Sequence, residues 1–123
     1  VRQYGFSSEE AESKKRSGDL PDDYQTAVLK PFVSSMAQEI GRALQFFFTS
    51  TPNNRVDHIM LAGGSAPLPG LTEAVTQQTG FACSAVNPFD GMEIGSSVRL
   101  KKMVREAPSY LTSCGLAMRR FLP

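Results

Sequence analysis

The sequence predicts an α/β fold, and three patterns along its 123 residues indicate it. Two short apolar runs, at residues 56–62 and 83–86, have the length and composition of strands. Between them lie a glycine-rich turn and a helical pattern over Leu71–Thr79, which together make a parallel βαβ unit. A long amphipathic pattern over residues 33–49 predicts a helix that packs against this unit.

The first helix is expected over Ser8–Ser17. Serines and glutamates open it, where they cap free amides and complement the positive helix end. Three basic residues fall in its last turn, and Gly18 is suited to end it. Ala11 is its main apolar residue, so this helix has to dock on another segment.

The second helical region contains the strongest periodic signal in the sequence. Pro31 interrupts the pattern early and predicts either a new helix start or a kink. Phe46 does not fit the apolar face that follows. Seven residues three and four apart make that face: Val33, Met36, Ala37, Ile40, Leu44, Phe47 and Phe48.

A turn at residues 51–54 leads to the first strand, whose continuous run Ile59-Met60-Leu61 predicts burial on both faces. Residues 92–105 carry only a weak helical pattern. The last helix is expected to begin at residues 107–109, with Leu111, Cys114, Gly115 and Met118 on one face.

Composition gives no electrostatic reason to expect nucleic acid or anionic lipid as a partner, because thirteen basic and twelve acidic residues leave a net charge of +1. Apolar runs fall short of the ~18–20 residues of a membrane span, and neither a span nor a signal peptide is expected. Cys83 and Cys114 are interpreted as buried free thiols, with a disulfide as the alternative.

Catalytic and metal-binding residues are not predicted. The single histidine, His58, lies beside Asp57 early in a strand, which favours a hydrogen-bonded polar position over a catalytic base. One histidine and two distant cysteines do not have the spacing of a zinc site.

The turn after the first strand is the most informative segment. It brings Gly63 and Gly64 to the carboxyl end of the strand, where open α/β sheets bind their ligands. Two residues without side chains let a flat ring or a sugar approach the backbone, and Ser65 adds a hydroxyl and an amide. A plain strand-to-helix turn is the alternative. The lysine of a phosphate-binding loop and the dinucleotide fingerprint are both missing.

This segment resembles the adenosine motif of the actin-like ATPase superfamily, in which a hydrophobic strand ends in Gly-Gly and is followed by a small residue, an apolar residue and Pro. Here the matching residues are Gly63, Gly64, Ser65, Leu68 and Pro69. The resemblance implies ATP as the ligand. It also implies the C-terminal half of an actin-like (ribonuclease H-like) domain with parallel strands, flanking helices and an incomplete sheet.

The first helix is similar to the superfamily helix that places a glutamate and a lysine against the ribose, which assigns those contacts to Glu12 and Lys15. Three residues apart, both lie on one helix face. A surface ion pair is the alternative. On this resemblance, residues 1–28 end the upper lobe that covers the nucleotide, and residues 29–123 form a lower-lobe segment with the adenosine motif.

The superfamily's two aspartate-glycine loops, which hold metal and phosphates, are missing, and Asp90-Gly91 is interpreted as an ordinary loop. Magnesium binding is therefore assigned to the full-length protein. The chain is expected to be a fragment, inactive alone, whose two strands need an upstream segment, a second copy or its large helices for stability. Whether the full-length protein is an ATPase stays open.

Three stretches resemble the PilM family of type IV pilus assembly proteins: LPDDYQTAVLKPF, LQFFF and VNPFDGM. The ending SCGLAMRRF is similar to the last connecting helix of the superfamily, in which Gly115 would allow close packing between lobes; an ordinary small residue between packed helices is the alternative. The resemblance implies a cytoplasmic ATP-binding scaffold, peripheral to the inner membrane, that links inner-membrane pilus proteins to the motor and serves twitching motility. The cytoplasmic tail of PilN would bind the missing N-terminal half. The alternatives are a fragment of an actin-like ATP hydrolase or kinase, or an FtsA-like cell-division protein.

Overall fold

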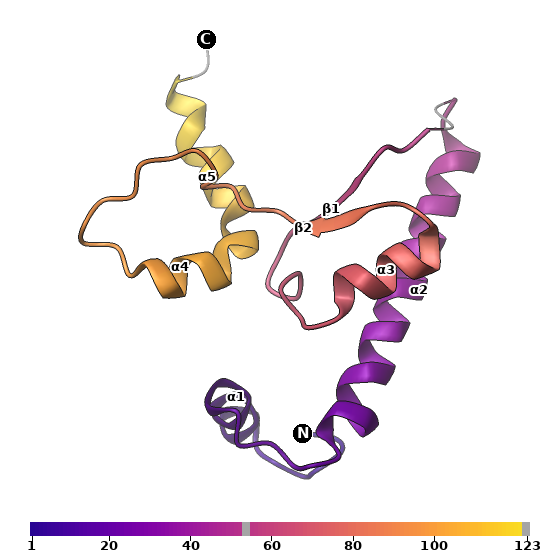
Figure 1. Cartoon of the computed structure of the whole chain (residues 1–123), viewed down its shortest axis with the longest axis vertical. Helices are drawn as coiled ribbons and strands as arrows, with labels where there is room; N and C mark the ends of the chain where they lie inside the picture. Colours follow the sequence, from indigo (N-terminus) through magenta and orange to yellow (C-terminus); the bar gives the residue numbers. More distant parts are fainter. Residues whose placement is uncertain (53–54, 122–123) are drawn as a thin grey trace.

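The structure is a computed structural model that describes residues 1–52 and 55–121, so the expected turn at residues 51–54 falls partly outside it (Figure 1). The elements, in chain order, are α1 (Ser8–Ser17), a π-helical turn (Gln25–Leu29), α2 (Lys30–Ser50), β1 (Ile59–Leu61), α3 (Leu71–Thr79), β2 (Cys83–Ala85), α4 (Leu100–Glu106), a 3₁₀ turn (Ala107–Tyr110), α5 (Leu111–Met118) and a short 3₁₀ turn (Arg119–Phe121).

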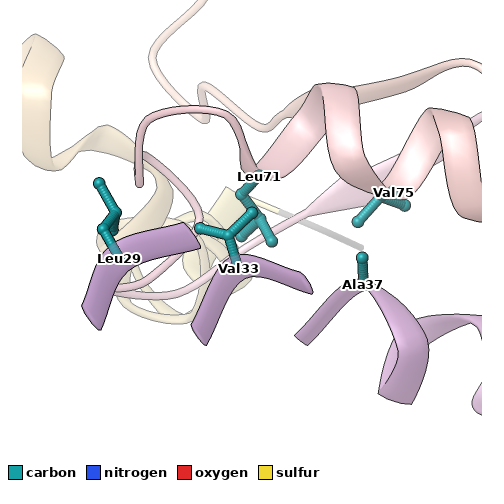
Figure 2. Close-up of a cluster of buried hydrophobic side chains, with 5 residues drawn as sticks. All are labelled: Leu29, Val33, Ala37, Leu71 and Val75. Carbon is teal, nitrogen blue, oxygen red and sulfur yellow. The ribbon is translucent and has the colours of Figure 1, made fainter. Parts of the chain in front are cut away.

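The hydrophobic core lies where α2 packs across α3 (Figure 2). The apolar stripe predicted on α2 faces this core, since every one of its seven residues is buried or half-buried. Phe46, which broke the pattern, is 72% exposed. The stripe prediction is therefore confirmed. Five side chains form the centre of the core: Leu29, Val33, Ala37, Leu71 and Val75.

The helix accommodates Pro31 through a widened turn. The amide of Lys30 donates to the carbonyl of Gln25, five residues back, where a regular helix would use a carbonyl four residues back. A proline ring clashes with the carbonyl of the regular turn and offers no amide of its own. The helical run consequently continues from Tyr24 to Ser50 without the break that the sequence left open.

The two strands pair in parallel, with Ile59 opposite Cys83 and Leu61 opposite Ala85, which confirms the βαβ unit. Ile59 and Leu61 pack on the core, and successive side chains of a strand point to opposite faces. Met60, between them, is 64% exposed. The prediction that the first strand is buried on both faces is therefore wrong for this chain, because helices cover one face of the sheet and the other is open.

The C-terminal arm, residues 91–121, is largely exposed and forms the left-hand part of Figure 1. In the region of residues 92–105, where the sequence pattern was weak, a helix forms only from Leu100 onward, as α4. Leu111 and Met118 on the expected face of α5 remain 42% and 48% exposed. A Cβ at Gly115 would have no neighbour within 4 Å among the described residues, so the close packing expected there is not formed within this chain.

The chain exposes 9382 Å² to solvent. A compact monomer of its mass, 13.4 kDa, exposes about 6,500 Å². Much of the apolar surface is thus uncovered. Among the described residues, no helix combines the length and apolar character that crossing a membrane requires.

Candidate functional site

The segment that links β1 to α3 is a series of short turns. The carbonyl of Gly63 accepts from the amide of Ala66 at 3.2 Å, and the carbonyl of Ser65 accepts from Leu68 at 3.1 Å. A third turn joins Leu68 to Leu71, the first residue of α3, at 3.2 Å. Ala66 is buried, and this fixes the turns against the rest of the molecule.

The two glycines of this segment have different surroundings. Gly63 has a φ of +100°, a conformation that favours glycine, and its amide donates to the carbonyl of Pro108 at 2.8 Å. Gly64 is exposed, and a Cβ added there would have the Ser109 hydroxyl as its nearest neighbour at 3.9 Å. Gly63 therefore holds the 3₁₀ turn in place, while Gly64 leaves open space.

Helix α1 has the boundaries that its capping residues predicted. The side chain of Ser7 accepts from the amide of Glu10 at 3.1 Å, and Gly18 ends the helix in the left-handed conformation. Every side chain of α1 is at least partly exposed. This helix is consequently placed by its ends and by its neighbours rather than by a buried face.

Glu12 forms ion pairs with two cations of its own helix. Lys15 Nζ lies 3.0 Å from Glu12 Oε2, and Arg16 Nε donates to Glu12 Oε1 at 2.9 Å. The hydrogen bonds from Lys15 and then from Arg16 lower the pKa of the Glu12 carboxyl. The ion pair that the sequence left as the alternative is thus formed, and it holds the carboxylate ionised on the helix surface.

A half-open cavity of about 290 Å³ is lined by three segments that lie far apart in the sequence. Glu12, Lys15 and Arg16 line it from α1, and Gly64, Pro67 and Leu68 line it from the glycine turn. The third wall is the end of α4 and the turn that follows it, where the lining residues are Arg105, Glu106 and Ser109. In Figure 1, α1 and α4 lie one below the other on the same side of the molecule.

The structure therefore brings together three of the five residues that the sequence singled out, Glu12, Lys15 and Gly64. Gly63 and Ser65 belong to the same turn, but within the described chain they are outside the cavity lining. The amide of Gly63 donates to the carbonyl of Pro108, which belongs to the turn that forms the third wall. Ser65 contributes its carbonyl to the turn that precedes α3.

The third wall was missed by the sequence reasoning. Arg105 Nη2 lies 3.6 Å from Glu106 Oε1, and the Tyr110 hydroxyl donates to Glu106 Oε2 at 3.3 Å. Tyr110 in turn contacts the ring of Phe89, with 5.9 Å between the centroids. The weak periodicity before Glu106 gave no signal for this wall, because a backbone bond from Gly63, far away in the sequence, places it.

The described residues form three hollows of larger volume. One, of about 710 Å³, is an open depression along α1 that Glu12 and Arg16 also border. Another, of about 580 Å³, runs between α2 and α3, and the third, of about 610 Å³, is lined by Tyr4, Phe6 and Tyr24 beside α1. Neither Gly63 nor Gly64 lines any of these three hollows, although Lys15 borders the one beside Tyr4. The charged groups of α1 and the glycine turn meet in the cavity of about 290 Å³, which is therefore the candidate site although it is smaller.

The remaining polar candidates have structural roles. His58 Nε2 is 2.8 Å from the Ser84 hydroxyl, which confirms the expected hydrogen-bonded polar position. Cys83 and Cys114 are free thiols, as predicted, but half-buried rather than buried. Burial, and then the charge of Glu73, raises the pKa of Cys83. In residues 1–52 and 55–121, no group of three or more His, Cys, Asp or Glu is placed to hold a metal ion.

The fold defined here, a mixed α/β chain with a small parallel sheet and helices over one of its faces, is shared with a solved structure. That structure is a PilM-PilN type IV pilus biogenesis complex, to which the chain is similar with a TM-score of 0.73 and 24% identity. The match covers 99% of this chain and 34% of that one, so the chain spans about a third of its length.

The family described as type IV pilus assembly protein PilM matches residues 1–121. The chain belongs to the PilM family, and the family resemblance predicted from its sequence is confirmed.

Proposed function

We propose that this chain forms the adenosine side of the ATP site in a scaffold protein of type IV pilus assembly. The observation that supports it is the shared cavity, in which Glu12 and Lys15 of α1 lie across from Gly64. A carboxylate accepts hydrogen bonds from sugar hydroxyls, and a lysine donates them. Gly64 leaves room for a flat ring, and Pro67 and Leu68 add apolar surface beside it.

The size of the cavity indicates which part of the nucleotide it holds. At about 290 Å³ it is at the lower limit of small-molecule sites, which run from roughly 300 to 1,000 Å³. A nucleoside is a better match to this space than a triphosphate with its magnesium ion. The phosphates and the metal are accordingly assigned to the rest of the full-length protein, and we expect weak or absent ATP binding by this chain alone.

The division into two lobes fits the same picture. Residues 1–28, which include α1, would close the site from above, and residues 29–123 would supply the glycine turn and the third wall. The buried core of the chain belongs to the second unit, whereas α1 has no buried side chain. Such a helix can move relative to the core at little cost in buried area.

In the pilus machinery, the proposed role is that of a cytoplasmic scaffold, peripheral to the inner membrane, which couples inner-membrane pilus proteins to the motor and so supports twitching motility. The similar structure is a complex with PilN. We assign recognition of a PilN tail to the part of the full-length protein outside this chain. The open sheet face at Met60 and the exposed α5 are then surfaces that the remainder of the protein covers.

Isothermal calorimetry with ATP and magnesium tests the nucleotide site, on this chain and on the full-length protein that contains it. Binding is expected for the full-length protein and not for the chain. Lys15→Ala removes a donor from the cavity, and Gly64→Val fills it, so each is expected to weaken binding by the full-length protein. Lys101→Ala, an exposed lysine of α4 outside the cavity, is the control.

Two results would contradict the proposal. Micromolar binding by the chain alone would show that the adenosine side is not half of a larger site. Unchanged binding by both Lys15→Ala and Gly64→Val would show that the nucleotide lies elsewhere.

A further inference from the structure

We infer that Arg105 and Glu106 form a base-reading pair that selects adenine over guanine. The inference rests on the proposed nucleoside site and adds to it the group that recognises the base. It is carried by the third wall of the cavity, where a donor and an acceptor lie next to each other on the side opposite α1.

Glu106 is a well-positioned acceptor. Its two carboxylate oxygens face different partners, Tyr110 at 3.3 Å and Arg105 at 3.6 Å, and its side chain is 34% exposed. The backbone bond from Gly63 to Pro108 ties the turn that follows Glu106 to the glycine turn. The pair is therefore fixed relative to Gly64, the point where a flat ring can enter.

The long Arg105–Glu106 separation leaves both groups available to a ligand. At 3.6 Å it exceeds the usual range of a charge-assisted hydrogen bond, about 2.7–2.9 Å. Glu12, by contrast, is bound by Lys15 and Arg16 at 3.0 and 2.9 Å. Because Arg105 and Glu106 line the same cavity as α1, a sugar bound beside α1 would place its base toward them.

The chemistry of this pair distinguishes the two purines. Adenine presents an acceptor, N7, next to a donor, the N6 amino group, whereas guanine presents two acceptors, N7 and O6. A guanidinium only donates, and an ionised carboxylate only accepts. Arg105 can therefore donate to N7 of either base. Glu106 can accept from N6 of adenine but would meet the lone pairs of O6 in guanine.

Competition binding with the full-length protein tests the inference, using ATP, GTP and ITP with magnesium. ITP carries O6 in place of the N6 amino group, so it probes Glu106 without any substitution. The wild-type protein is expected to prefer ATP over both by roughly five- to a hundredfold, the range of one good bidentate pair. Glu106→Gln should bring the ratio close to one, because an amide both donates and accepts.

Two further variants separate the roles of the groups. Arg105→Met removes the donor to N7, which both purines share, so it should weaken ATP and GTP alike and leave their ratio unchanged. Glu39→Gln breaks a comparable surface ion pair, the one with Arg42 at 3.1 Å on α2, and should change neither affinity nor ratio.

The outcomes are distinguishable from failure of the site itself. If no nucleotide binds the wild-type protein, the proposed function and this inference both fall. If ATP binds but ITP binds equally well, or if Glu106→Gln keeps the full preference, the nucleoside site stands and the inference is overturned.

Discussion

The contrast between Gly63 and Gly64 gives the sharpest test of the local structure. Gly63→Ala places a side chain at a φ of +100°, which costs about 1–3 kcal/mol. Gly64 lies outside the left-handed region, and an added methyl group would have its nearest neighbour, Ser109 Oγ, at an ordinary 3.9 Å. Gly64→Ala should therefore leave the free energy of unfolding unchanged or raise it by up to about 1 kcal/mol, because alanine lowers the conformational entropy of the unfolded chain.

Urea unfolding of the chain, followed by circular dichroism, measures both variants against the wild type. Gly63→Ala is expected to unfold at lower urea than Gly64→Ala, with equal denaturant slopes. Amide exchange at position 63 is a second readout, because that amide is bound to Pro108 and should exchange faster in Gly63→Ala. If Gly64→Ala loses as much stability as Gly63→Ala, the different roles given to the two glycines are wrong.

Three other expectations concern the core, a helix cap and a carboxylate. Leu71→Ala, at a residue 1% exposed, should lower the free energy of unfolding by about 2–5 kcal/mol. Leu116→Ala, at a residue 64% exposed, should change it by less than about 0.5 kcal/mol. Equal losses in urea unfolding would contradict the core assigned to α2 and α3. Ser7→Ala removes the cap of α1 and should cost about 1 kcal/mol, seen as fraying of the helix in backbone chemical shifts; an intact first turn would refute the capping role. The pKa of the Glu12 carboxyl is lowered in the folded chain. The stability that this group contributes is therefore present above pH 4.5, its ordinary pKa, and is lost as the pH falls through the folded pKa. An NMR titration that gives Glu12 a pKa at or above 4.5 would show that its pairs with Lys15 and Arg16 do not form.

The elements with local signals were predictable from the sequence. Helix α1 begins after Ser7 and ends before Gly18, and α3 ends before Gly80, because caps act through hydrogen bonds within a few residues. The stripe on α2 was equally clear, since apolar residues recur three and four apart from Val33 to Phe48. Such features depend on near neighbours in the chain, which the sequence displays.

Features that depend on distant contacts were not predictable. The widened turn at Pro31 is one solution among several that a proline allows. The exposure of Met60 depends on how many layers cover the sheet. The third wall depends on the bond from Gly63 to Pro108, across 45 residues. Glu12, Lys15 and Gly64 could thus be found by resemblance to known motifs, whereas Arg105 and Glu106 required the fold.

The uncovered surface indicates the scale of what completes this fold. A sheet in an α/β protein is normally covered by helices on both faces, and here Met60 marks a face without that second layer. The exposed area exceeds that of a compact monomer by nearly 3,000 Å², well above the roughly 800 Å² that one partner buries in a standard interface. An excess of this size agrees with a match that covers 34% of the chain in the similar structure.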